Sequence, residues 1–249
     1  MSVERAEKIA KMAELLDDAA ATATAIPQLT KNFSLGVDTA YAVQEALVGR
    51  RLARGEKLVG LKMGLTSRAK MAQVGVHEVI WGRLTDATAI PDGGTVRTAG
   101  FIHPRIEPEV AFLLRGGQIA AVAPALEIID SRYANFEFTQ PDVVADNTSA
   151  AAYTIGPWRP VPADLDNLGV LLEIDGRVVQ TGSTAAILGD PRRALAEGRR
   201  LTARHGVTLE DDWIFLAGAA TEAVPLRPGA HVRAVVQGLG SASVKAALA

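Results

Sequence analysis

The chain has 249 residues, 48% of them hydrophobic and 22% charged, so it can bury a sizeable core as one large domain or as one domain with a small appendage. Its formal net charge of -2 argues against nucleic acid and anionic membrane as partners. Because the sequence contains no cysteine, it excludes disulfides, thiolate nucleophiles and zinc–sulfur sites.

The sequence also argues against a signal peptide and a membrane span. The N-terminal stretch MSVERAEKIAKMAELL places acids and bases among its apolar positions. The longest apolar stretch, IAAVAPALEII, contains a proline and a glutamate. We therefore expect a soluble cytoplasmic protein that binds neither membrane nor nucleic acid.

Helical patterns come first along the chain. Residues 2–24 carry apolar side chains at helical spacing. A second helix is expected from Asp38, as its N-cap, to Gly55. The next segment, 56–65, predicts a strand and a turn, and TSRAKMAQVG, residues 66–75, predicts a short helix.

From about Thr88 onward, beginning with TAIPDGGTV, short apolar runs alternate with Gly, Pro, Asp and Asn, a pattern that predicts strands and hairpins. The clearest hairpin is VLLEIDGRVVQ, in which Asp175-Gly176 suits a tight turn. One late helix is expected with Asp190 as N-cap and Pro191 at its first position.

Together these patterns predict an α+β fold. A helical N-terminal portion, residues 1–75, leads into a β-rich body, residues 76–249, and we expect the two to form one continuous domain.

Two glutamates lie close together in HPRIEPEVAF, within a largely apolar run. If the run is extended, Glu107 and Glu109 project from the same face, because side chains alternate along a strand. Neighbouring carboxylates repel each other and are costly to desolvate, and a bound cation would remove both penalties. The alternative is a solvated strand face on which Arg105 pairs with the carboxylates.

A divalent cation such as Mg²⁺ or Mn²⁺ requires more oxygen ligands than two glutamates supply. PALEIIDSRY offers a third carboxylate, either Glu127, which is embedded in the apolar run, or Asp130. In an extended run these two side chains would face opposite sides. The spacing alone does not decide between them.

Lys62 interrupts another apolar segment, VGLKMGL. Either its aliphatic chain carries the ammonium to the surface, or the amine is held inside for proton transfer or imine formation. The sequence alone favours the surface position.

The segment ADNTSA, residues 145–150, is either a polar turn or a set of hydrogen-bond donors for a polar ligand. The sequence contains no P-loop and no G-x-S-x-G motif, which argues against the commonest phosphoryl-transfer and hydrolase functions.

Seven blocks of the sequence resemble, in order, the hydratase/decarboxylase branch of the fumarylacetoacetate hydrolase superfamily: GLKMGLTSRAKM, GVHEVIWGRLTDA, HPRIEPEVAF, PALEIIDSRY, PDVVADNTSA, AGAATEAVPL and GLGSASV. The resemblance covers most of the chain and implies rolled, mixed sheets around a metal, and a homo-oligomer. It also implies Mg²⁺, with Mn²⁺ as an alternative, bound by Glu107, Glu109 and Glu127 rather than by Asp130. Lys62 is then expected to line the site.

Within this branch, the sequence most resembles enzymes that decarboxylate 2-oxohex-3-enedioate to 2-hydroxypenta-2,4-dienoate in aromatic meta-cleavage pathways. The alternative is a hydratase that adds water to 2-hydroxypenta-2,4-dienoate on the same scaffold. The hydratases tend to have Asp where this chain has Ala87, and Gly-Pro where it has Thr221-Glu222. These differences favour the decarboxylase.

The other residues expected at the site form two groups. Lys62 would bind or protonate the oxygen on which negative charge develops, with Asp86 as its proton-relay partner. The expected substrate contacts are Ser149, Thr221 and Arg132. Arg132 would hold the departing carboxylate.

Arg68 is the alternative for that carboxylate.

Relatives generally carry a longer excursion between the strands of the metal ligands, and here residues 118–120 nearly close it. We expect this shortening to leave the ligands in place and to alter a lid or a subunit contact.

The expected partners are a small 2-oxo or 2-hydroxy dienoic acid and a dienoate hydratase that forms a complex with this chain. Hydrolysis of an acylpyruvate would require a histidine–glutamate pair to activate water, and the sequence offers no convincing pair. A purely structural subunit is a further alternative, against which the intact Glu107, Glu109, Glu127 and Lys62 argue.

Overall fold

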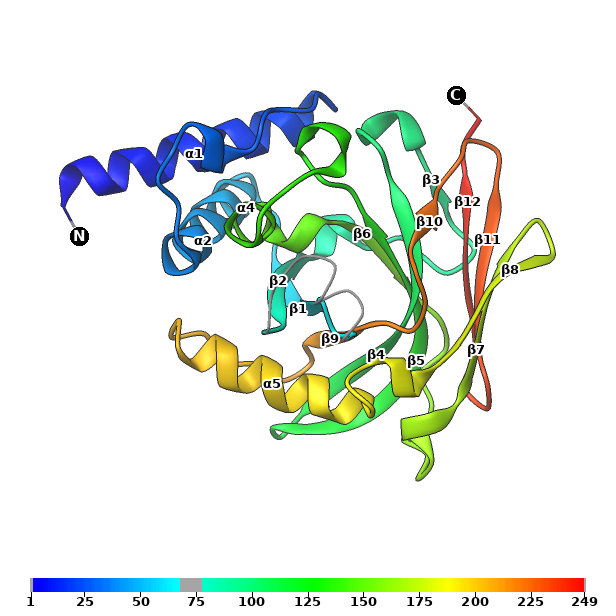
Figure 1. The fold of residues 1–249 in the computed structure, drawn as a ribbon. Coiled ribbons are helices and arrows are strands. Elements are labelled where there is room, and N and C mark those ends of the chain that lie inside the picture. The colour runs from blue at the N-terminus through cyan, green and yellow to red at the C-terminus, as the bar shows by residue number, and fades with distance from the viewer. Residues whose placement is uncertain (1, 68–77, 249) are drawn as a thin grey trace.

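The computed structural model describes residues 2–67 and 78–248. The N-terminal helices α1 (Val3–Ala21) and α2 (Val37–Ala53) pack against each other beside the sheets (Figure 1). The predicted N-cap of the second helix is wrong by two residues, because Gly36 is the cap and Asp38 lies in the first turn. Most of the helix predicted over residues 66–75 lies outside the described residues.

Two further α-helices follow. The sequence patterns missed the short α4 (Gln140–Ala145). A capping box between Thr139 and Asp142 caps its N-terminus. The later α5 (Pro191–Ala203) confirms its prediction, since the Asp190 carboxylate accepts the backbone N–H of Arg192. Short 3₁₀ turns lie at η1 (Leu29–Lys31), η2 (Asp86–Thr88), η3 (Thr98–Gly100), η4 (Ala134–Phe136), η5 (Asn147–Ser149), η6 (Leu165–Asn167) and η7 (Thr184–Ala186).

The larger sheet has seven strands in the order β2-β1-β9-β4-β5-β6, with β10 beside β4. It is mixed, because β1 and β9 are parallel and the other described pairs are antiparallel. Its strands are β1 (Leu58–Gly64), β2 (Ile80–Thr85), β4 (Arg105–Arg115), β5 (Gln118–Ile129), β6 (Ala150–Ile155), β9 (Ile214–Ala219) and β10 (Val224–Pro225).

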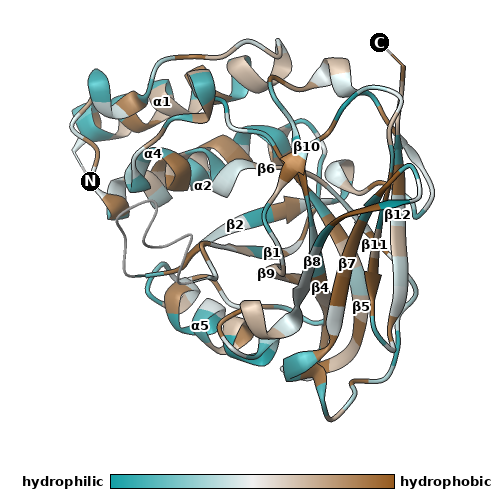
Figure 2. Cartoon of the chain, turned by 45° about the vertical axis from the view of Figure 1, so that its right-hand side comes forward, coloured by the Kyte–Doolittle hydropathy of each residue, from teal (hydrophilic) through white to brown (hydrophobic). Residues whose placement is uncertain are grey.

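The smaller sheet has five strands in the order β3-β12-β11-β7-β8. Its strands are β3 (Thr95–Val96), β7 (Gly169–Ile174), β8 (Arg177–Ser183), β11 (His231–Val236) and β12 (Gly240–Ala246). A hydrophobic core that includes Ile106, Leu126 and Leu172 joins it to one face of the larger sheet. Figure 1 shows the helices on the other side, and Figure 2 shows the hydrophobic character of β7 at the junction of the sheets. The α+β fold with curled mixed sheets is confirmed.

Two hairpins follow directly from local sequence. At Asp175-Gly176 both residues have positive φ, 52° and 75°, which confirms the predicted turn between β7 and β8. Gly116 and Gly117, with φ of 55° and 68°, join β4 directly to β5, so the shortened connection is a tight turn. The strand predicted over residues 88–96 is largely wrong, because in this range Thr95–Val96 is the strand and Ala89 forms an isolated bridge with Tyr153.

The helical portion and the β-rich body share one sheet. Strand β1 precedes residue 75, yet it lies inside the larger sheet between β2 and β9. We therefore infer that the two portions fold as one unit. No helix in the described ranges is both long and apolar enough to cross a membrane.

Phe112 tests the core between β4 and β9. It is fully buried, and its ring stacks on Phe215 with centroids 6.4 Å apart. Phe112→Ala should lower the free energy of unfolding by about 3–5 kcal/mol, because it leaves a cavity. Urea denaturation measures this, with Val178→Ala on an exposed part of β8 as a control that should change it by less than about 0.5 kcal/mol. Equal effects of the two substitutions would contradict the packing.

Candidate active site

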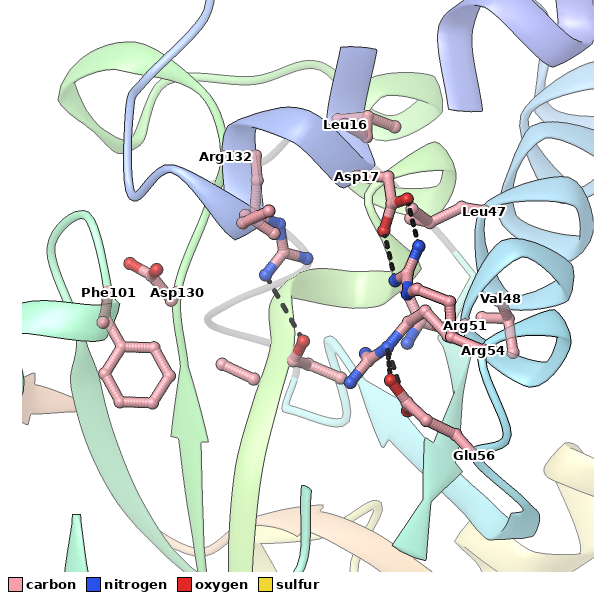
Figure 3. Close-up of a pocket in the computed structure, with 16 residues that line it drawn as sticks. Leu16, Asp17, Leu47, Val48, Arg51, Arg54, Glu56, Phe101, Asp130 and Arg132 are labelled. Atoms are coloured by element: carbon pink, nitrogen blue, oxygen red, sulfur yellow. Dashed lines mark hydrogen bonds and ion pairs between the residues drawn. The ribbon is translucent and has the colours of Figure 1, made fainter. Parts of the chain in front are cut away.

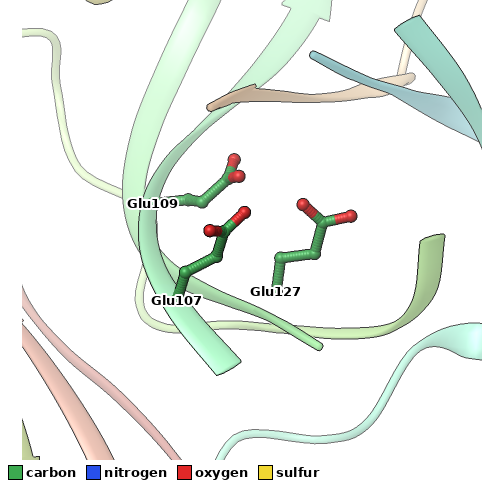
Figure 4. A group of neighbouring side chains, drawn as sticks. All are labelled: Glu107, Glu109 and Glu127. Atoms are coloured by element: carbon green, nitrogen blue, oxygen red, sulfur yellow. The ribbon is translucent and has the colours of Figure 1, made fainter. Parts of the chain in front are cut away.

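Three glutamates meet on one face of the β4–β5 pair. Glu107 lies directly opposite Glu127 in the register, and Glu109 follows on the same face of β4. All three side chains are buried and point toward one another, and each offers an oxygen within 4.8 Å of the others (Figure 4). Asp130 is not part of this cluster. Its carboxylate accepts the backbone N–H groups of Ile102 and His103, both at 2.8 Å.

Glu109 and Glu127 each have a buried carboxylate oxygen without a donor among the described residues. Nζ of Lys62 lies 3.0 Å from Oε1 of Glu127, and the backbone N–H of Gly218 donates to Oε2 of Glu109 at 2.9 Å. Oε1 of Glu109 and Oε2 of Glu127 accept no hydrogen bond within the described part of the chain. Buried carboxylate oxygens without donors are costly. A set of hard oxygen ligands suits Mg²⁺ or Mn²⁺, so the cluster fits a divalent cation.

Burial sets the protonation of the cluster. Desolvation and the charges of Glu127 and Glu107 raise the pKa of Glu109 well above its usual value. Desolvation also raises the pKa of Glu127 to about 7, although Lys62 opposes this rise. The metal-free cluster therefore retains protons near neutral pH, and a bound cation would displace them.

Lys62 is buried, with 2% of its surface exposed, so the surface position favoured by the sequence is wrong. Its ammonium donates to the carbonyl oxygen of Thr148 at 3.0 Å and pairs with Glu127 at the same distance. Both partners are more than sixty residues away in the chain, and for this reason the local sequence could not reveal them.

The segment after α4 forms the wall beside Lys62. Asn147, Thr148 and Ser149 all have positive φ, between 48° and 56°. Left-handed conformations cost roughly 1 kcal/mol for each non-glycine residue, so this turn is strained. The Ser149 hydroxyl is buried and has no hydrogen-bond partner among the described residues. The sequence indicates the polar groups of this segment but not the hydrogen bonds that Asn147 and Thr148 make with β2.

Arg132 lies apart from the glutamates. Its Nε and backbone N–H donate to the carboxylate of Asp146, and its guanidinium also donates to the carbonyls of Asp146 and Ala150. Burial raises the pKa of Asp146 to about 6 against the opposing charge of Arg132. The guanidinium is therefore engaged in holding this segment of backbone, and its role with a substrate carboxylate stays a prediction.

A separate cavity of about 250 Å³ lies beside Arg132, between α1, α2 and the start of β6 (Figure 3). Its charged residues pair with one another, as Arg54 does with Asp17 and Arg51 with Glu56. None of the three clustered glutamates lines it. This cavity is therefore not the candidate metal site.

Asp86 and Thr221 are the two remaining residues that the sequence predicts at the site. Asp86 is exposed at the end of β2, where its carboxylate accepts the backbone N–H of Lys57 at 2.8 Å. Since Lys62 pairs with Gly82, four residues from Asp86, the structure does not bring Lys62 and Asp86 together. Thr221 lies two residues after Ala219, which pairs with Glu109 on β4.

The family follows from the match between residues 58–245 and the model of the fumarylacetoacetate (FAA) hydrolase C-terminal region. The chain belongs to the fumarylacetoacetate hydrolase family. A 4-oxalocrotonate decarboxylase from Pseudomonas sp. is 48% identical to it over 95% of this chain and 97% of its own length. A 2-keto-4-pentenoate hydratase from Paraburkholderia xenovorans (strain LB400) is 34% identical over 83% of this chain and 82% of its own.

Among solved structures, 4-oxalocrotonate decarboxylase from Pseudomonas putida G7, complexed with magnesium and adipate, superposes with a TM-score of 0.93. That protein is 39% identical, and the match covers 96% of this chain and 97% of the other. The family and the fold expected from the sequence resemblance are both confirmed. The Arg68 alternative lies outside the described residues.

The raised pKa values predict a stability that depends on pH and metal. Folded-state pKa values above 4.5 give a stabilisation that is complete below that pH and is lost as pH rises through about 7. In EDTA, the free energy of unfolding should fall by on the order of 1–3 kcal/mol between about pH 6 and about pH 8. Mg²⁺ should remove this decline, because it binds the deprotonated carboxylates.

Urea unfolding at the two pH values, with EDTA and with Mg²⁺, measures the effect. Glu127→Gln is the matched control, because it cannot ionise at that position, and its decline in EDTA should be smaller. A decline that is equal in both proteins and insensitive to Mg²⁺ would show that other groups cause it.

Proposed function

We propose that this protein is a Mg²⁺-dependent decarboxylase that converts 2-oxohex-3-enedioate (4-oxalocrotonate) to 2-hydroxypenta-2,4-dienoate and CO₂. The observation that carries the proposal is the buried cluster of Glu107, Glu109 and Glu127 beside Lys62. It occurs in a chain that is 48% identical to a 4-oxalocrotonate decarboxylase along nearly its whole length.

The length of the substrate agrees with a ligand of the related structure. Adipate, which that decarboxylase holds together with magnesium, is a six-carbon dicarboxylate. The proposed substrate, 2-oxohex-3-enedioate, has the same chain length and the same two terminal carboxylates. A dicarboxylate of this length is therefore a reasonable ligand for this chain as well.

The three glutamates would hold the Mg²⁺ ion through their carboxylate oxygens. When bound, the ion supplies Lewis acidity that stabilises negative charge at the 2-oxo oxygen of the substrate. The surrounding strands exclude bulk water from the carboxylates, which strengthens every electrostatic interaction there.

The reaction breaks the bond between C5 and the distal carboxylate. The bonding electrons form a C4–C5 double bond, the C3–C4 π pair moves to C2–C3, and the 2-oxo oxygen gains the charge and then a proton. The product is 2-hydroxypenta-2,4-dienoate. An interaction that strengthens as this oxygen becomes negative lowers the barrier more than it favours substrate binding.

Lys62 is the group that we propose for that interaction. Its ammonium has three N–H donors, of which one is directed to Thr148 and another lies at Glu127. The remaining donor can bind the developing oxyanion or supply its proton. A bound cation would supply the electron sink, so Lys62 need not form an imine. We further propose that Ser149 and Thr221 contact the substrate.

The alternative is hydration of 2-hydroxypenta-2,4-dienoate on the same scaffold, since hydratases of the family are 34% identical to this chain. Both reactions pass negative charge onto an oxygen next to a carboxylate, so the same cluster can serve either. The higher identity to the decarboxylase favours decarboxylation.

We also propose that the protein works in the cytoplasm as a homo-oligomer and associates with a dienoate hydratase. The chemistry supports this association, because the product of the decarboxylation is the substrate of that hydratase. Direct transfer would limit loss of the dienol to its more stable keto form.

A paired assay tests the reaction. With Mg²⁺, the protein should release CO₂ from 2-oxohex-3-enedioate faster than it hydrates 2-hydroxypenta-2,4-dienoate, and chelation should abolish turnover. CO₂ release and loss of dienol absorbance are measured on the same preparation. Faster hydration would select the alternative, and full activity after chelation would reject the metal-dependent scheme.

Lys62→Met tests the proton-transfer group. The rate constant kcat should fall by about 10²- to 10⁴-fold, because a positioned acid is removed. Mg²⁺ affinity should weaken by no more than about 10-fold, since the carboxylates remain. Lys245→Met, at an exposed position of β12, is the control and should leave both quantities unchanged. Nearly full activity of Lys62→Met would return Lys62 to a structural role.

A further inference from the structure

We propose that Asn147 is a positioning residue that places Lys62 for the reaction. It acts through the carbonyl of Thr148, the next residue, and does not itself touch the metal ligands. Its kinetic consequence rests on the proposed function, whereas its effect on the geometry of Lys62 does not.

The side chain of Asn147 completes the edge of β2. Its Oδ1 accepts the backbone N–H of Arg83 at 2.7 Å, and its Nδ2 donates to the backbone carbonyl of Arg83 at 2.9 Å. Strand β2 lies at the end of the larger sheet, so Arg83 directs these two groups away from β1. The amide therefore replaces a neighbouring strand at this point, and it fixes the η5 turn to the sheet.

A second hydrogen bond fixes the same turn one residue later. The hydroxyl of Thr148 donates to the backbone carbonyl of Trp81 at 2.8 Å. On the other side of the turn, the backbone of Ser149 donates to the carbonyl of Asp146, whose carboxylate is held by Arg132. The left-handed backbone of η5 is thus attached at both ends. Asn is among the residues that tolerate this conformation best.

Two glycines permit the close approach of the turn. A Cβ at Gly82 would lie 2.6 Å from the carbonyl oxygen of Asn147, and a Cβ at Gly64 would lie 2.5 Å from Cγ2 of Thr148. Both distances are below ordinary contact. The sheet therefore receives η5 directly against its backbone. This close packing indicates that the position of the turn matters to the structure.

The packing of η5 against β2 sets the position of the Thr148 carbonyl, which accepts the Lys62 ammonium. Lys62 pairs with Gly82 in the β1–β2 register, and Gly82 lies between Trp81 and Arg83, to which the turn is bonded. As a result the Thr148 carbonyl lies 3.0 Å from Nζ of Lys62. If Asn147 lost its two bonds, the strained turn could relax, and the ammonium would lose the acceptor that directs it beside Glu127.

The experiment compares Asn147→Ala with Thr184→Ala. Thr184 is a matched control, because it is fully buried and its hydroxyl also makes two hydrogen bonds, with Leu165 and Leu168. Asn147→Ala should lower kcat by about 10- to 100-fold, while KM and Mg²⁺ affinity change less than about 3-fold. Thr184→Ala should lower Tm without lowering kcat. Asn147→Asp keeps the acceptor for Arg83 and should fall between the wild type and Asn147→Ala.

A readout that needs no turnover accompanies the kinetics. In protein labelled with ¹⁵N at lysine side chains, the buried ammonium of Lys62 should give a slowly exchanging signal, assigned by its loss in Lys62→Met. Asn147→Ala should remove or broaden this signal, Asn147→Asp should weaken it, and Thr184→Ala should preserve it. If Asn147→Ala does not fold, Asn147→Asp decides alone.

A double variant completes the test. In the Lys62→Met background, Asn147→Ala should cause less than about a 2-fold further loss of kcat, because the group that it positions is gone. An equal loss in both backgrounds, or an unchanged Lys62 signal in Asn147→Ala, would overturn the inference. If the wild type turns over neither dienoic acid, the proposed function fails, and the Lys62 signal still decides the role of Asn147.

Discussion

The burial of three carboxylates at one place is the constraint on which the rest of the structure depends. Glu107, Glu109 and Glu127 lie in a region of low dielectric constant, where their mutual repulsion and desolvation are large. The ammonium of Lys62 pairs with Glu127, and the backbone N–H of Gly218 donates to Glu109. Buried carboxylate oxygens of Glu109 and Glu127 still have no donor among the described residues, and a divalent cation is the natural complement.

The strands around the cluster show how the backbone meets this constraint. Strands β4 and β5 are long and joined by two glycines, so Glu107 and Glu127 are held opposite each other without an intervening excursion. The pairing of β4 with β9 shifts register after Glu109, where Gly218 has a φ of 114°. This irregularity turns the N–H of Gly218 toward the Glu109 carboxylate instead of the neighbouring strand. Such bulges commonly re-aim groups beside active sites.

The sequence alone predicted the parts that local chemistry determines. The alternation around Glu107 and Glu109, the Asp175-Gly176 turn and the cap at Asp190 depend on neighbours within a few residues. Alternation could not distinguish Glu127 from Asp130, because each is reasonable on its own face of a strand. The family resemblance selected Glu127, and the register places it opposite Glu107.

The error at Lys62 has the opposite origin, because its partners are distant in the chain, and the roles predicted for Arg132 and Asp86 stay predictions. Lys62 seemed suited to the surface until Glu127 and Thr148 were seen beside it. Arg132 seemed available for a substrate, but the buried carboxylate of Asp146 engages it. Asp86 lies beyond the end of the β1–β2 pair, where its carboxylate accepts the backbone N–H of Lys57.

Two buried ion pairs therefore have different positions in this part of the structure. The pair between Lys62 and Glu127 lies in the glutamate cluster, and the pair between Arg132 and Asp146 holds the backbone that leads to Thr148. A buried ion pair seldom adds net stability compared with apolar packing, but breaking one side of it is costly. The second pair is thus better understood as a device that selects one backbone conformation. That conformation is the strained left-handed turn at η5, and its carbonyl at Thr148 is what Lys62 requires. The conformational free energy that the left-handed turn costs is thus spent beside Lys62, whose ammonium the Thr148 carbonyl accepts.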